Sequence, residues 1–165
     1  MLAAFSGLRA QPLNEYQAKA SYLYNFIKFV EWPEGAFPTA KTPVVVCVIE
    51  EKLLQRSLEE TARGHRLEAR TVVTRQVHDA RRVDGCHVLF IGSRDPPRVA
   101  SILRQLNSPG VLTVSEVDGF TSMGGAVNLR LEGLRIRLVI NTSAVELQQL
   151  RISPRLMGLV RVVRE

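Results

Sequence analysis

The pattern of hydrophobic positions predicts a chain in which strands and helices alternate. The segments VVVCVIE (44–50) and CHVLFIG (86–92) are continuously apolar and rich in β-branched residues, as in parallel strands buried on both faces. Residues 51–63 carry leucines at helical spacing, and Gly64 follows them as a suitable C-terminal cap. This alternation predicts an α/β fold: a Rossmann-like, mainly parallel sheet with helices on both faces.

The second half of the chain continues this pattern and adds a hairpin. Segments 126–133 and 134–141 alternate between apolar and polar residues and meet at Glu132-Gly133, which predicts an antiparallel hairpin at the sheet edge. Ser153 and Pro154 are expected to begin a last helix. That helix should bury Leu156, Leu159, Val160 and Val163, and we further expect strands over 67–74 and 110–116, a helical turn within 76–84, and helices over 96–107 and 141–150.

The first helix is unusually aromatic, since residues 22–33 read YLYNFIKFVEWP. We expect it to run from an N-cap at Asn14 to about Glu31, because Trp32-Pro33 ends it. At helical spacing its polar positions form a narrow stripe, and the apolar arc is roughly 200° wide, about twice that of a one-sided surface helix. The sequence assigns Gln17, Ser21, Tyr24, Lys28 and Glu31 to the polar stripe.

A sheet covers only one side of a helix, so the second apolar flank requires another cover. We predict that Tyr22 and Phe29, with Phe26 near the divide and Trp32 at the helix end, form a protein contact. Lys19 falls within the same arc, which suits a partly polar contact. The alternative is that the last helix covers this flank within one chain.

Composition is that of an ordinary globular protein. The chain has 165 residues, of which 45% are hydrophobic and 23% charged, so we expect a single domain over 15–165. Residues 1–14 are either the remnant of a signal peptide or a disordered tail. The net charge of +6 comes from scattered basic residues without a nucleic-acid-binding motif, and no apolar segment reaches the length of a membrane span.

Candidate catalytic chemistry is sparse. Ligands of open α/β sheets bind at the carboxyl ends of the strands, but Glu50 and Glu51 follow the first strand, where carboxylates would repel a phosphate. The motifs GxxxxGK[ST], GxSxG and HExxH are missing from the sequence. Cys47 with Cys86 and His87 is only a partial metal-ligand set. We therefore expect no catalytic residues, no metal and no cofactor.

Arg151 and Arg155 flank the start of the last helix, where cations oppose the helix dipole. Either both are simply solvated, or they close around a carboxylate, a phosphate or an acidic partner surface. The cysteines Cys47 and Cys86, taken alone, are consistent with two buried thiols or with one disulfide.

The segments EYQAKASYLYNFIKFVEWP, VVVCVIE, CHVLFIGS, GVLTVSEVDGF, GGAVNL, LRIRLVIN and LRISPRLMGL, in this order, resemble the YfiR-like family from about Glu15 to Val162. The resemblance implies a periplasmic, typically dimeric α/β protein that restrains an inner-membrane diguanylate cyclase by binding its periplasmic part, and so lowers cyclic-di-GMP and biofilm formation. It also implies that there is no catalytic site and no metal.

The resemblance further implies that Cys47 and Cys86 match a family cysteine pair, whereas a second pair of some relatives, after VDGF, is absent here. The first and third strands are neighbours in the common 2-1-3 order, so we predict a Cys47–Cys86 disulfide in the oxidising periplasm. Two alternatives are a periplasmic small-ligand-binding module with Arg151 and Arg155 as anion contacts, and a cytosolic nucleic-acid binder that uses the positive charge.

Overall fold

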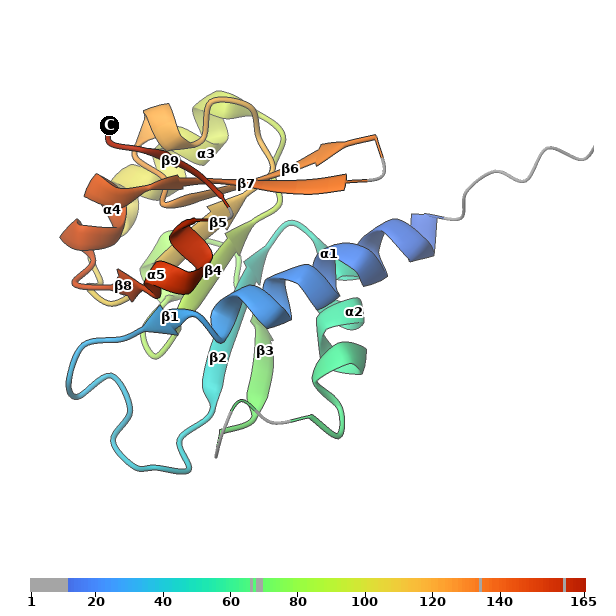
Figure 1. The fold of residues 1–165 in the computed structure, drawn as a ribbon, viewed down its shortest axis with the longest axis vertical. Coiled ribbons are helices and arrows are strands. Elements are labelled where there is room, and N and C mark those ends of the chain that lie inside the picture. Colours follow the sequence, from blue (N-terminus) through green and yellow to red (C-terminus); the bar gives the residue numbers. More distant parts are fainter. Residues whose placement is uncertain (1–11, 66, 68–69, 134, 159) are drawn as a thin grey trace, which may run out of the picture.

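The computed structural model describes residues 12–65, 67, 70–133, 135–158 and 160–165, and it confirms a mixed α/β fold around a mostly parallel sheet (Figure 1). The sheet is seven-stranded, in the order β3-β2-β4-β5-β6-β7-β9. Strands β3, β2, β4, β5 and β6 run parallel, β7 is antiparallel to β6, and β9 is parallel to β7. The strands are β2 (Val44–Ile49), β3 (Val72–Gln76), β4 (Val88–Ile91), β5 (Leu112–Ser115), β6 (Val127–Glu132), β7 (Arg135–Asn141) and β9 (Arg161–Val163).

Helices cover both faces of the sheet, as the continuous apolar strands require. On one face lie α1 (Pro12–Ile27) and α2 (Lys52–Ala62), which pack on Val46 and Val48 of β2. The opposite face takes the alternate residues Cys47 and Ile49 and is covered by α3 (Pro96–Gln105), by η1 (Ala80–Arg82) and by Phe120 just before η2 (Thr121–Met123). The remaining helices are α4 (Thr142–Leu147) and α5 (Pro154–Met157).

The first helix is shorter at its C-terminal end than the sequence predicts. It ends at Ile27, and Val30–Glu31 forms the short strand β1 instead, antiparallel to β8 (Arg151–Ile152). The amide of Ser153 donates to the carbonyl oxygen of Phe29 at 2.8 Å and extends this pairing. The helix also begins at Pro12, two residues before the expected Asn14 cap.

The prediction that the chain ends in a long helix is wrong, because that segment ends in a strand. The last helix has four residues and ends at Met157, and the chain then continues as β9 along β7. The β-branched Val162 and Val163 suit a strand, and the free side of β7 offers backbone hydrogen bonds that a helix would leave unused. The β6–β7 hairpin is therefore not the edge of the sheet. Leu156 is buried as expected, while Val160 and Val163 are half-buried and Leu159 lies outside the described residues.

Candidate functional site

The polar stripe assigned to α1 contains one error. Tyr24 is buried, with 4% of its surface exposed, and its ring meets the ring of His65 edge-on at a centroid distance of 6.3 Å. Helix α2, which ends just before His65, packs against α1 on this side. The side of α1 that carries Tyr24 is thus covered by α2, a helix that the sequence predicts but does not place there.

The flank predicted to form a protein contact is partly covered within the chain. Phe26 is buried and belongs to the main core, whereas Tyr22 and Phe29 are half-buried against it. Tyr22 lies in a cavity of about 360 Å³ that Ile136 and Val160 also line. Phe26 is therefore a core residue. Tyr22 and Phe29 each keep an exposed part that is available to a partner.

Trp32 is held by its own chain. Its indole N–H donates to the carbonyl oxygen of His87 at 3.2 Å, and its ring meets the ring of Phe37 edge-on at 5.8 Å. His87 itself is buried, and its Nδ1 accepts from the amide of Val45 at 3.0 Å. Its Nε2 lies 2.9 Å from the carbonyl oxygen of Ala36, so that nitrogen carries the proton and the imidazole is neutral.

Burial lowers the pKa of His87, and Arg70 lowers it further, against the opposite effect of the hydrogen bond to Ala36. Protonation at Nδ1 would replace the bond from Val45 with two facing N–H groups. The ring of Phe37 stacks on the imidazole at 4.3 Å. The two hydrogen bonds of the His87 ring therefore connect β2 to the segment that follows Trp32.

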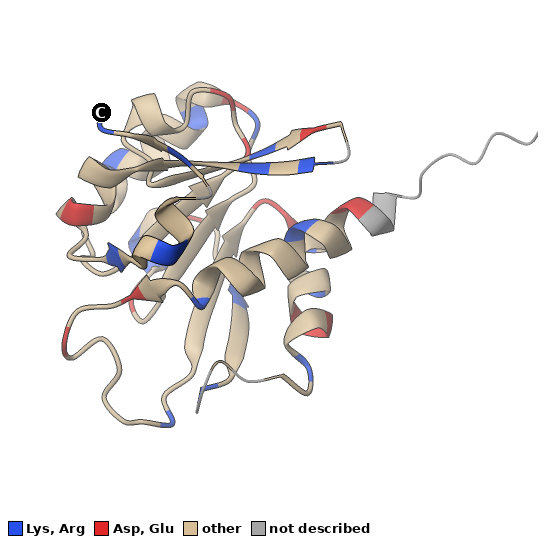
Figure 2. Cartoon of the chain, in the orientation of Figure 1, with Lys and Arg blue, Asp and Glu red and all other residues tan. Residues whose placement is uncertain are grey.

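Arg151 and Arg155 are exposed, but they do not flank a long helix. Arg151 lies in β8 opposite Glu31, and Arg155 lies in the short α5, whose first turn Ser153 caps. Figure 2 shows basic residues on β7, β8 and α5, so the two arginines belong to a basic C-terminal region of the chain. Whether they bind an anion or an acidic partner stays a prediction.

The two cysteines form a disulfide, as predicted. Cys47 lies in β2 and Cys86 two residues before the neighbouring β4, with Cα atoms 5.8 Å apart. Arg75 covers the bond from β3, since its guanidinium donates to the Cys86 Sγ at 3.0 Å and to the Asp84 carbonyl oxygen at 2.7 Å. The disulfide therefore links two adjacent parallel strands inside the smaller core cluster.

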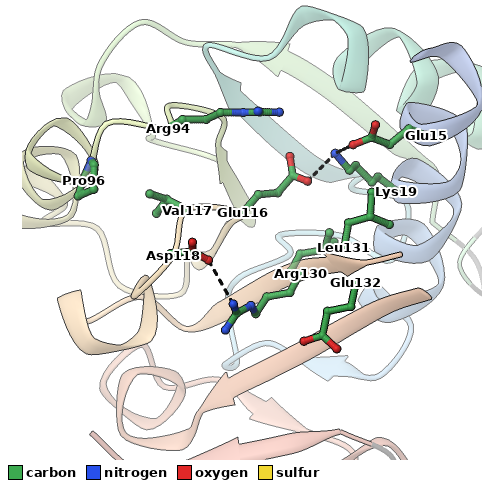
Figure 3. Close-up of a pocket in the computed structure, with 11 residues that line it drawn as sticks. Glu15, Lys19, Arg94, Pro96, Glu116, Val117, Asp118, Arg130, Leu131 and Glu132 are labelled. Atoms are coloured by element: carbon green, nitrogen blue, oxygen red, sulfur yellow. Dashed lines mark hydrogen bonds and ion pairs between the residues drawn. The ribbon is translucent and has the colours of Figure 1, made fainter. Parts of the chain in front are cut away.

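A cavity of about 570 Å³ lies at the carboxyl ends of the parallel strands, where α/β folds bind ligands (Figure 3). Lys19 of α1 lines one side of it and is only 2% exposed. The ammonium group of Lys19 binds the carboxylate of Glu116, directly after β5, at 2.6 Å and also that of Glu15. This geometry corrects the sequence prediction that Lys19 belongs to an external contact.

Buried polar groups fix the end of β5 beside Lys19. The Ser115 hydroxyl donates to the Ile91 carbonyl oxygen at 2.7 Å. The side-chain amide of Asn128 donates to the carbonyl oxygens of Ser115 and Val117 at 2.9 and 3.0 Å. All three bonds are buried, and the two from Asn128 hold the residues on either side of Glu116.

The end of β2 is held equally closely. A Cβ at Gly92 would lie 2.5 Å from the Cβ of Glu51 and 2.8 Å from the carbonyl oxygen of Glu50, so only glycine fits there. Glu50 has a φ of 58°, a left-handed conformation that is costly for a non-glycine residue, and its carboxylate binds Arg98 at 2.7 Å. Together these contacts place Glu51 near the cavity.

Several ionisable groups lie close together at the cavity and shift one another's pKa values. Burial and then the neighbouring Glu116 raise the pKa of Glu51, against the opposing effect of Lys19. Burial lowers the pKa of Lys19, but the hydrogen bonds from its ammonium to Glu116 and Glu15 more than offset this, so its pKa lies above the ordinary value. Burial and then Glu51 raise the pKa of Tyr16. These groups therefore influence one another.

Sequence reasoning missed this cluster, although two signals for it were present. Lys19 is a lone cation in an apolar arc with a glutamate four residues before it, which is the pattern of a buried ion pair. Glu116 is the last residue of the strand predicted over 110–116, so it lies at the carboxyl edge of the sheet, where ligands of α/β folds bind. Within the described residues, no group of three or more His, Cys, Asp and Glu side chains could hold a metal.

The chain belongs to the YfiR/HmsC-like family, whose sequence profile matches residues 16–161. Comparison with curated proteins returned no significant match. Membership of this family implies a regulatory protein connected with diguanylate cyclase signalling. None of the helices in the described ranges has the length and hydropathy needed to cross a bilayer.

Proposed function

We propose that this protein is a periplasmic regulatory binding protein that restrains an inner-membrane diguanylate cyclase and thereby lowers cyclic-di-GMP and biofilm formation. The observation that carries the proposal is the family match over residues 16–161. The disulfide is consistent with it, because structural disulfides persist in oxidising compartments such as the periplasm.

The proposed mechanism is occlusion. A dimer of this chain binds the periplasmic part of the cyclase and holds it in an inactive arrangement, and an input signal shifts that population. The exposed parts of Tyr22 and Phe29 are the proposed contact, because aromatic side chains bury a large area on few rotatable bonds. Arg151 and Arg155 are proposed to meet acidic residues of the partner.

Site-specific crosslinking tests the proposal. A photoreactive amino acid replaces Tyr22 in the exported protein, and a second protein carries it at Gln76, an exposed position on the far edge strand β3. Irradiation of whole cells should link position 22, and not position 76, to a membrane diguanylate cyclase that mass spectrometry identifies. Recovery of no membrane signalling protein from position 22 in cells that produce such a cyclase would contradict the proposed contact.

A further inference from the structure

The cavity at the carboxyl ends of the strands is lined by charges that only partly neutralise one another. Arg130 binds Asp118 at 3.3 Å, and Glu132 binds Arg137 at 2.7 Å. These two pairs are self-contained and exposed, so they carry little weight in the charge balance of the cavity.

The other charges do not balance locally. Two carboxylates, those of Glu15 and Glu116, share the single ammonium group of Lys19, which leaves one negative charge. Arg94 lines the same cavity, and within the described residues its guanidinium has no carboxylate within ion-pair distance. Figure 3 shows Arg94 extended over the cavity from the loop after β4, above Glu116. The Arg94 guanidinium and a carboxylate in excess over Lys19 therefore face the same space, and Glu51 adds a further carboxyl group beside them.

Apolar side chains complete the wall. Val117, Leu129 and Leu131 line the cavity beside the charged groups. Small-molecule sites commonly combine such a lining with a few fixed polar groups that set the orientation of the ligand, and a volume of about 570 Å³ is within their usual range.

We infer that this cavity binds a small zwitterion with an ammonium group and a carboxylate, such as a free amino acid or a short peptide. The ligand carboxylate pairs with the Arg94 guanidinium, whose planar fork of N–H donors matches two carboxylate oxygens. The ligand ammonium donates to the Glu116 carboxylate and supplies the missing positive charge. An apolar side chain on the ligand packs against Val117 and the leucines of β6.

Binding at this site acts directly on α1. Glu116 fixes Lys19, and a ligand ammonium that competes for Glu116 changes the ion pair that ties α1 to the end of β5. The cavity thus offers a binding site for a chemical signal at the helix that carries Tyr22 and that ends two residues before Phe29. The inference goes beyond the proposed regulatory function, and binding at the cavity can be measured without any partner protein.

Isothermal titration calorimetry of the exported, oxidised full chain at pH 7 tests the inference. The probes are glycine, β-alanine, γ-aminobutyrate and L-alanyl-L-alanine, which separate the two charges by increasing distances. Alaninamide and N-acetylalanine are matched probes, each of which lacks one charge. We expect at least one zwitterion to bind and the single-charge probes to bind at least about tenfold more weakly, because each of them lacks the charge that pairs with either Arg94 or Glu116.

Variants identify the contacts. Arg94→Gln and Glu116→Gln should each weaken the bound zwitterion by at least about tenfold. Arg98→Gln is the control, because Arg98 also lies near the start of α3 but pairs with Glu50 outside the lining. Arg94 is exposed, so its variant is expected to fold normally, and melting curves establish this for each protein. Failure of all four zwitterions to bind at about 10 mM, or equal affinity in the Arg94→Gln protein, would overturn the inference.

Discussion

Removal of the Cys47–Cys86 disulfide by a double change to alanine should lower the stability of the chain considerably. The bond closes a loop with a sequence separation of 39 residues. The loop-entropy relation for that length gives about 13 cal/mol/K, or about 4 kcal/mol at 25 °C, as the stabilisation that the cross-link supplies through the unfolded state. For a chain of this size, that loss corresponds to a melting temperature lower by about 8–16 °C.

Urea denaturation of the oxidised protein, the reduced protein and the double alanine variant measures this effect. The reduced protein isolates the loss of the cross-link, because both sulfur atoms remain in the core. Both perturbed proteins should unfold at lower urea, with a steeper dependence on denaturant because the unfolded chain expands. A loss below about 1 kcal/mol in the reduced protein would refute the loop-entropy reasoning.

The other predictions concern α1 and His87. Tyr22→Ser with Phe29→Ser should leave the chain folded while partner binding weakens by roughly 2 kcal/mol or more; unfolding of the double variant would show that this flank is core. Lys19→Met should cost about 3 kcal/mol in urea denaturation, since it leaves carboxylates without their cation, and adding Glu116→Gln should recover part of that loss; purely additive losses would contradict the ion-pair account. The folded pKa of His87 lies below its unfolded value, so the unfolded state binds the proton first and stability should fall as pH drops from about 7 to 5, by at most about 1.4 kcal/mol per pH unit; the same slope in His87→Gln would contradict this.

The central sheet could be predicted from the sequence because its strands are buried on both faces. Segments 44–50 and 86–92 are continuously apolar, and the structure places β2 and β4 within them as neighbours. The hairpin follows from the largely alternating apolar and polar residues, and the neighbouring positions of the two cysteines follow from the 2-1-3 order of the strands, whereas their pairing is also implied by the family resemblance. Each of these features is encoded locally or by a general rule of topology.

The edges of the fold could not be predicted in the same way. Residues 161–163 read RVV, and only the free side of β7 decides that they form a strand. Val30–Glu31 likewise leaves the helical pattern because Arg151–Ile152 offers a strand partner more than a hundred residues away. The Lys19–Glu116 pair joins α1 to the end of β5, and although Lys19 stands out in its apolar arc, sequence spacing does not identify Glu116 as its partner. Tertiary pairing overrides local propensity at these positions.

The most direct test of the proposed function is the cyclic-di-GMP content of cells that lack this protein. Extracts of the deletion strain, of the strain complemented with the exported chain and of the strain complemented with the exported Tyr22→Ser/Phe29→Ser chain are compared by mass spectrometry. Restraint of a cyclase predicts that deletion raises cyclic-di-GMP and that the exported chain restores the original level, while the double variant restores it only in part. An unchanged cyclic-di-GMP level in the deletion strain, in cells that contain the crosslinked cyclase, would contradict the proposed function.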